Sequence, residues 1–284
     1  YESYMEVIFP TSSFSNTVSL LGFICSCLSL IGALFTGLSY LCSPNVRKNF
    51  FYYLVFHLAI SDLGVSITGL YTVPPTEIDP SLCTIMATMR SFSVMSSFIL
   101  NLSIALFLYS AVRNDKNQED FFKEKNTFLA VNYGFAVFGA IGPLLSNAYG
   151  PSTIYCWIDS SSTSITAKFW LIVEAYITLP IVLVWVVILY FWIIKKMKST
   201  RNEEKYTNIY RLTIIPVIFF FCNFGTMLDF FVKSSFLRIA HICLRQLQGS
   251  IHALLYGFMI IKDKANQKLV VDEAVSMQQT ILES

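Results

Sequence analysis

Ionisable side chains interrupt several long apolar runs of this chain, and their types limit the chemistry that they can perform. Arg90, Glu174, Asp229 and Arg245 lie toward one end of such runs. A charged group at membrane depth costs roughly 3 kcal/mol on insertion scales, so we expect it to face the protein interior and to have a partner. Arginine binds carboxylate or phosphate through two parallel hydrogen bonds. These residues therefore form either mutual ion pairs or a site for an anionic ligand.

Helical spacing places Arg90 on nearly the same face as Cys83, which precedes it by seven residues, or about two turns and 10 Å. We expect aromatic and polar residues near the same ends of other runs to line a site with it. Trp157 follows Cys156 in a polar segment, and we favour a plug that packs this segment onto the helices over a ligand contact. The candidate ligand-binding residues are Arg90, Trp157, Trp170, Glu174, Tyr176, Asp229, His241 and Arg245.

Asp62 is the ionisable residue deepest in an apolar run, where it needs hydrogen-bond donors. Asn101 or Ser103 of one run and Ser250 or His252 of another can supply them. A buried network of this kind either holds the helices in one packing or has two arrangements that favour two packings. Both interpretations stay open. The candidate switch network contains Asp62, Asn101, Gln248, Gly249 and His252.

The sequence contains none of the short patterns that are typical of catalytic or metal sites. Cys-x-x-Cys, His-Glu-x-x-His, a carboxylate cluster, a nucleophile elbow and a phosphate-binding glycine loop are all missing from it. The net charge is only +2, and no Lys/Arg-rich block is interleaved with aromatic residues. We therefore expect no enzyme activity, no metal, no cofactor and no nucleic-acid partner.

The composition indicates a polytopic membrane protein. Of the 284 residues, 55% are hydrophobic and 13% are charged, and the mean hydropathy is +0.58. A transmembrane helix needs roughly 20 mostly apolar residues. A six-span arrangement is the alternative, because Lys233, Arg238, His241 and Arg245 lie close together near the last two runs. We predict seven spans at 17–42, 51–74, 83–112, 127–147, 168–194, 209–232 and 240–262.

The distribution of basic residues predicts the orientation of these spans. Most of the 20 Lys and Arg residues lie in the loops after the first, third and fifth runs or beyond the last run, and residues 1–16 contain none. Because basic loops stay in the cytoplasm, the N-terminus is outside. The predicted fold is an all-α membrane protein, a seven-transmembrane helix bundle at 17–262. It is preceded by an extracellular segment, 1–16, and followed by a cytoplasmic amphipathic helix and tail, 263–284.

Two of the seven cysteines fall outside the hydrophobic depth of the bundle. Cys83 lies at the outer mouth of the third span, and Cys156 lies in the loop between the fourth and fifth spans. Both therefore face the extracellular side, where a disulfide persists. We predict a Cys83–Cys156 bridge that holds the long outer loop across the top of the third span.

Three stretches, two in the matching helices and one in the second outer loop, resemble G-protein-coupled receptors of the cyclic-AMP-receptor-like group, with features of secretin-type receptors. These are LVFHLAISDLG at 54–64, CW at 156–157 and QGSIHALLYGF at 248–258. The third span ends LFLYSAVR without an Asp-Arg-Tyr, and the seventh lacks an Asn-Pro-x-x-Tyr. Rhodopsin-class activation details are therefore not implied.

The resemblance implies a receptor that binds an extracellular ligand in the outer half of the bundle and activates a heterotrimeric G protein. Basic juxtamembrane loops attract anionic lipid headgroups in any polytopic protein, so membrane lipids are expected partners. The receptor interpretation adds a G-protein cavity at the inner face. The candidate G-protein contacts are Arg113, Lys195, Lys196, Lys198 and Arg201.

Two other functions stay open for a multi-pass protein of this kind, which we expect in the plasma membrane. A transporter or channel also has a polar interior, but it predicts inverted repeats or paired broken helices, and no convincing pair is found. A structural subunit of a membrane complex with a receptor-like fold would have lost signalling. The missing Asp-Arg-Tyr and Asn-Pro-x-x-Tyr motifs are compatible with such a loss.

Overall fold

The computed structural model describes residues 11–71, 79–114, 118–151, 155–159, 164–199, 214–232 and 239–261. The side chains of residues 11–17, 114, 118, 197–199 and 226–232 are not part of that description. Residues 1–10 and the predicted cytoplasmic tail at 263–284 lie outside the described residues.

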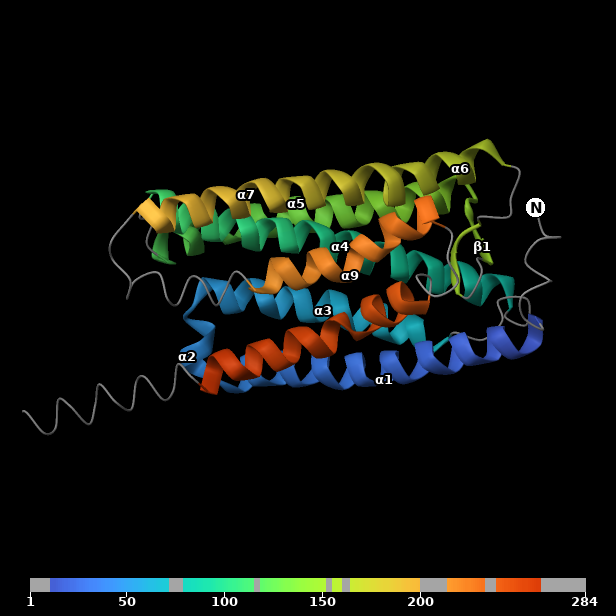
Figure 1. Cartoon of the computed structure of the whole chain (residues 1–284), viewed down its shortest axis with the longest axis horizontal. Helices are drawn as coiled ribbons and strands as arrows, with labels where there is room; N and C mark the ends of the chain where they lie inside the picture. The colour runs from blue at the N-terminus through green and yellow to red at the C-terminus, as the bar shows by residue number, and fades with distance from the viewer. Residues whose placement is uncertain are drawn as a thin grey trace, which may run out of the picture.

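Long helices lie side by side along the long axis of the molecule (Figure 1). The segment 165–199 is helical throughout, and residues 172–178 of it, labelled η3, form a π-helix. In order, the labelled helices are α1 (Thr11–Cys42), α2 (Pro44–Arg47), α3 (Phe50–Leu70), α4 (Pro80–Asn114), α5 (Gln118–Leu145), α6 (Ile165–Leu171), η3 (Ile172–Thr178), α7 (Leu179–Ser199) and α9 (Ile214–Val232), and a final helix covers 239–261.

Five helical segments of the described chain are long and apolar enough to cross a membrane. They coincide with the first five predicted runs, and Ile214–Gly225 is a shorter apolar helix within the sixth. The seventh run, 240–262, falls on the final helix. Large apolar side chains such as Ile31, Leu145 and Leu254 are exposed on the outer faces of the helices, as expected where lipid is the solvent. The five segments are Val18–Cys42, Phe50–Leu70, Pro80–Arg113, Glu119–Leu145 and Ile165–Lys196.

Helix α4 is the central element of the bundle. It packs against α3, α5, α7, α9 and both strands of the outer loop. Its start follows from its sequence, because Pro80 occupies the first turn and Asp79 Oδ2 accepts the backbone N–H groups of Ser81 and Leu82 at 3.0 and 3.1 Å. The start of α4 at Pro80 therefore determines how far along the bundle each later residue of this helix lies.

Helix α5 begins at Gln118, nine residues before the predicted start at 127. The apolar run marks only the part of a helix that lies in hydrocarbon, and the polar residues before it continue the helix into water. Glu119 and Asp120 in the first turn favour this start because they interact with the positive end of the helix dipole. At the other end, Asn147 adopts a left-handed φ of 49°, which ends the helix.

A two-stranded hairpin covers the end of α4 that begins at Pro80, called the outer end after the predicted orientation, at the opposite end of the molecule from α2 (Figure 1). Strand β1 (Tyr149–Pro151) pairs antiparallel with β2 (Cys156–Ile158). The predicted disulfide between Cys83 and Cys156 is confirmed. Tyr149 adds a second anchor, because its hydroxyl donates to the Ala140 carbonyl of α5 at 2.9 Å. Burial, together with nearby Glu174, raises the pKa of this phenol, which keeps it a donor.

Small residues let α1 and the final helix approach closely. A Cβ at Gly32 would lie 2.8 Å from Ser250 Cα and 3.0 Å from the Gly249 carbonyl oxygen. In lipid, where helices gain little from hydrophobic burial, such close backbone approach is a main source of association. Gly37, one helical turn further along α1, has nothing within 4 Å of the same position.

We expect Gly32→Ala to lower the free energy of unfolding by about 1–3 kcal/mol, because the new methyl group meets backbone that cannot rotate away. Thermal unfolding of purified protein in nanodiscs measures this change. Gly37→Ala is the matched control, and we expect it to be neutral or to stabilise by up to about 1 kcal/mol. Equal melting temperatures for the two variants would contradict the assigned helix contact.

Candidate functional site

The disulfide places Trp157 over the gap between α4 and η3. Its indole N–H lies 3.1 Å from Ser91 Oγ and 3.2 Å from Glu174 Oε2, and Ser91 Oγ donates to the same carboxylate oxygen at 3.2 Å. One oxygen of Glu174 thus joins the outer loop, α4 and η3. These contacts fit a residue that fastens the loop onto the bundle.

Glu174 lies in the first turn of the π-helix η3. It is only 2% exposed, whereas Tyr176, two residues later, is 42% exposed, so the two side chains leave opposite sides of the helix. The wider turn is supported by Thr178, whose hydroxyl donates to the Val173 carbonyl at 2.8 Å. Glu174 Oε1 has no hydrogen-bond partner among the described residues. Single π-helical turns are frequent at functional sites.

Arg90 is buried in α4 beneath Tyr155 of the outer loop. Its guanidinium carbon lies 3.8 Å from the centre of the Tyr155 ring, and its exposed fraction is 2%. Its Nη1 group lies 3.5 Å from Thr68 Oγ1, a distance typical of a weak hydrogen bond. No carboxylate of the described chain pairs with Arg90. A guanidinium has five N–H donors, and the contacts of Arg90 in the described chain, with Thr68 and Tyr155, use only some of them.

Arg245 of the final helix is the second cation of this region. Its guanidinium carbon lies 5.9 Å from the centre of the Phe98 ring, and it lies within electrostatic range of Arg90, Tyr155 and Glu174. It forms no ion pair with a carboxylate of the described chain. Neither Arg90 nor Arg245 therefore pairs with Glu174, the one candidate carboxylate whose side chain is described. The side chain of Asp229, the remaining candidate partner, lies outside the description.

Gln246 lies beside this group and is also incompletely bonded. It is 1% exposed, and neither its amide oxygen nor its nitrogen has a hydrogen-bond partner among the described residues. Gly69 makes room for it, because a Cβ there would lie 2.7 Å from the Gln246 amide oxygen. The outer half of the bundle therefore holds several buried polar groups with unused hydrogen-bonding capacity.

Three of the predicted ligand-binding residues, Trp170, Tyr176 and His241, do not join the group around Arg90. Trp170 packs on α5, where a Cβ at Gly142 would lie 2.1 Å from its ring, and Tyr176 is on the exposed side of η3. His241 is buried against Gly225 of α9. Prediction from the sequence missed Thr68, Ser91 and Tyr155; the position of Tyr155, directly before the bridged cysteine, was the available signal.

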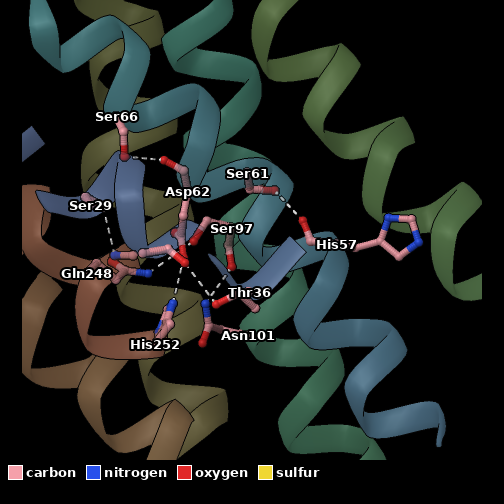
Figure 2. Close-up of polar contacts among 12 residues, drawn as sticks. Ser29, Thr36, His57, Ser61, Asp62, Ser66, Ser97, Asn101, Gln248 and His252 are labelled. Atoms are coloured by element: carbon pink, nitrogen blue, oxygen red, sulfur yellow. Dashed lines mark hydrogen bonds and ion pairs between the residues drawn. The ribbon is translucent and has the colours of Figure 1, made fainter. Parts of the chain in front are cut away.

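Asp62 is paired with His252 in the middle of the bundle (Figure 2). The His252 Nδ1–H group donates to Asp62 Oδ2 at 2.7 Å, and both side chains are nearly inaccessible. This contact joins α3 to the final helix. The expected bond from Asn101 to Asp62 does not form, because the Asn101 amide donates instead to the Ser97 carbonyl one turn earlier in α4, at 2.8 Å.

Gln248 and Gly249 extend the connection to three more helices. The Gln248 amide nitrogen lies 3.3 Å from Ser97 Oγ of α4, and its oxygen lies 3.4 Å from the Asn223 amide nitrogen of α9. The backbone N–H of Gly249 donates to Ser29 Oγ of α1 at 3.1 Å (Figure 2). The final helix is thereby bonded to α1, α3, α4 and α9 at one depth.

The predicted G-protein contacts that the structure describes lie at the other end of the bundle. Arg113 Nη1 donates to the Tyr109 hydroxyl in α4, and Lys195 of α7 lies with its ammonium 5.4 Å from the centre of the Trp192 ring. Lys196 is exposed one residue further along α7. The side chain of Lys198 and the whole of Arg201 lie outside the described residues.

These features define a multi-pass membrane protein with a disulfide-anchored outer loop and a polar interior. A family model described as 7 transmembrane receptor (Secretin family) matches residues 14–252. The match spans most of the chain, so the chain belongs to this family. The resemblance to secretin-type receptors is confirmed, and the narrower cyclic-AMP-receptor-like assignment stays a prediction. No curated protein matches the chain.

We expect the Asp62–His252 contact to stabilise the bundle far more than a surface ion pair. Removing one partner with Asp62→Ala or His252→Ala should cost about 3–5 kcal/mol, because the other polar group stays buried without it. The exposed Asp120–Lys123 pair, at 3.3 Å, is the control, and its loss should cost at most about 1 kcal/mol. Double-mutant cycles measured by thermal unfolding give both coupling energies, and similar values for the two pairs would contradict this expectation.

Proposed function

We propose that this protein is a G-protein-coupled receptor that binds an anionic extracellular ligand in the outer half of its bundle. The observation that carries the proposal is the pair Arg90 and Arg245, two guanidinium groups without a carboxylate partner in the described chain, beneath a disulfide-anchored loop. The proposal includes seven spans at 17–262, an extracellular N-terminus, a cytoplasmic tail at 263–284 and a location in the plasma membrane.

The charge of the site favours a carboxylate or phosphate on the ligand. Two neighbouring guanidinium groups repel each other, and an anion between them would relieve this repulsion and use their free N–H donors. The Tyr155 ring lies over Arg90 and would have to shift or stack on the bound group. Glu174 Oε1 and the Gln246 amide offer hydrogen-bonding groups for a polar or cationic part of the same ligand.

The site is joined to the middle of the bundle through two helices. Arg90 and Ser97 both belong to α4, and Arg245 and Gln248 both belong to the final helix. The Ser97–Gln248 contact therefore lies directly below the two arginines on the same pair of helices. A ligand that draws the arginines together would change the relative position of α4 and the final helix at this contact.

Activation would then be a shift between two packings of the helices. The central network has unused capacity for a second arrangement, because Asn101 Oδ1 and His252 Nε2 have no hydrogen-bond partner among the described residues. A ligand that binds one packing better shifts the population toward it. Asn223 connects this network to α9, whose outward movement would open the inner face.

The inner face would receive the G protein. Arg113, Lys195 and Lys196 lie there, and Lys198 and Arg201 follow in the same basic segment. Basic residues around a cavity attract a partner surface that is acidic or that presents the end of a helix. Family membership supports a receptor with a ligand and a G-protein partner.

We expect Arg90→Gln to lower the potency of an activating anionic ligand by roughly 10- to 100-fold, because it removes a charge-assisted bond. The assay is nucleotide exchange on heterotrimeric G proteins by purified protein in nanodiscs, scored over a panel of carboxylates and phosphates. Lys168→Gln is the matched control, since Lys168 is an exposed cation of α6 at the same end of the bundle. A retained Cys83–Cys156 disulfide and an unchanged melting temperature would show that Arg90→Gln folds.

Two results would contradict the proposal. One is a ligand response that Arg90→Gln and Arg245→Gln leave unchanged. The other is no exchange with any ligand and G protein, together with substrate flux in proteoliposomes, which would instead favour a transporter.

A further inference from the structure

A groove lies between α4 and α5 in the half of the bundle that carries the hairpin. Its volume is about 510 Å³, within the range of roughly 300–1,000 Å³ that small-molecule sites occupy in proteins. One face of each helix lines it, at the spacing of three or four residues that brings side chains to the same side. The α4 wall includes Thr84, Thr88 and Phe92, and the α5 wall includes Val137, Ala140 and Ile141.

The groove is apolar, although two threonines line it. The Thr84 hydroxyl donates to the Pro80 carbonyl at 3.0 Å, and the Thr88 hydroxyl donates to the Thr84 carbonyl at 2.8 Å. Each hydroxyl therefore uses its donor within α4 and keeps only acceptor capacity. None of the lining residues in the described chain is charged. A matching ligand is therefore almost wholly apolar and has a single hydrogen-bond donor.

The groove opens toward the hydrocarbon of the membrane. Its lining residues lie within Pro80–Arg113 and Glu119–Leu145, two of the segments that are long and apolar enough to cross a membrane. Ile85, Val137 and Ile141 are exposed along its walls, so the groove is open on the side of the bundle that lipid surrounds. Its occupant is therefore a component of the membrane itself.

Rigidity decides which apolar component the groove favours. Lipid tails are as apolar as the groove, so van der Waals contact and the loss of conformational freedom determine the preference. A flexible acyl chain loses rotational freedom when a groove holds it, whereas the fused rings of a sterol are already rigid. The walls are also well ordered. The threonines are β-branched, and the Phe92 ring at the inner end stacks on Tyr133 with centroids 6.0 Å apart and planes at 3°.

We propose that this groove binds a sterol of the membrane, with the fused rings along Thr88 and Ala140 and the sterol hydroxyl donating to Thr84 Oγ1. Thr84 is the lining residue of α4 closest to Pro80, so it lies closest to the headgroups, where a membrane sterol keeps its hydroxyl. The tail of the sterol then reaches Phe92. The site does not require the outer ligand or the G protein.

The same groove adjoins the anchor of the outer loop. Ala140 belongs to the α5 wall, and its carbonyl accepts the hydrogen bond from the Tyr149 hydroxyl of the hairpin at 2.9 Å. A sterol in the groove packs against the part of α5 that holds this bond. Bound sterol therefore supports the loop that covers Arg90.

Binding is tested with the full chain in nanodiscs that contain a photoactivatable cholesterol analogue, and mass spectrometry maps the labelled residues. We expect labelling within 84–92 and 137–144 that excess cholesterol abolishes. The 3α epimer of cholesterol should compete roughly three- to tenfold less well, because it has the same apolar area but misplaces one hydrogen bond. A photoactivatable phosphatidylcholine is the second arm. If it labels the same residues and cholesterol does not compete, the groove holds an acyl chain and the proposal is wrong.

Two variants test how the sterol is placed. Thr88→Phe fills the middle of the groove and should lower the affinity for cholesterol roughly tenfold, because the added ring removes contact with the fused rings. Thr84→Val removes the acceptor and keeps a similar shape, and it should lower the affinity roughly three- to tenfold. A retained Cys83–Cys156 disulfide and an unchanged melting temperature would show that both variants fold.

The controls separate a built site from general coating by lipid. Thr88→Val removes the other hydroxyl of the groove and should leave the affinity unchanged. Val184→Phe adds a ring to the exposed face of α7, outside the groove, and should also leave it unchanged. Equal losses in Thr88→Phe and Val184→Phe, or equal affinities for cholesterol and its 3α epimer, would overturn the proposal.

Discussion

The contact between Asp62 and His252 is the constraint on which the arrangement of the helices depends. In a bundle surrounded by lipid, apolar side chains gain little by facing inward, so polar contacts and close backbone approach must choose the neighbours of each helix. Asp62 and His252 are both buried and lie 2.7 Å apart, so neither helix can rotate without leaving a polar group exposed to hydrocarbon. The positions of Gln248 and Gly249 on the same helix then determine how α1, α4 and α9 pack.

The outer half of the bundle has the opposite character. There Arg90, Arg245 and Gln246 are enclosed but incompletely bonded within the described chain, while Trp157 and the disulfide hold the loop above them. Burying polar groups without full compensation is unfavourable, and natural proteins retain such groups mainly where a function requires them. The middle of the bundle is joined by direct contacts between helices and keeps a few unpaired atoms, such as Asn101 Oδ1 and His252 Nε2. The outer chamber instead holds two arginines without a carboxylate partner in the described chain.

The features that could be predicted from the sequence are those that depend on composition and on the side of the membrane where a residue is expected. The apolar runs identify the segments that are long and apolar enough to cross a membrane, because hydrocarbon tolerates little else. The bridge between Cys83 and Cys156 was predicted from the extracellular side on which both were expected to lie. Asp62 was expected to need buried donors, with Ser250 or His252 as candidates on the last run, and His252 is the one that binds it. The start of α5 at Gln118 was not predicted, because a helix leaving the membrane carries no hydrophobic signal. The π-helix that contains Glu174, and the Tyr155 ring over Arg90, depend on local geometry that residue types alone do not encode.

Helix α4 is the element through which these regions can influence one another. Arg90 and Ser91 near its outer end meet the loop and η3, Ser97 in its middle meets Gln248, and Arg113 lies at its inner end. A helix is stiff over this length, so a displacement at the outer site is transmitted along its axis rather than absorbed.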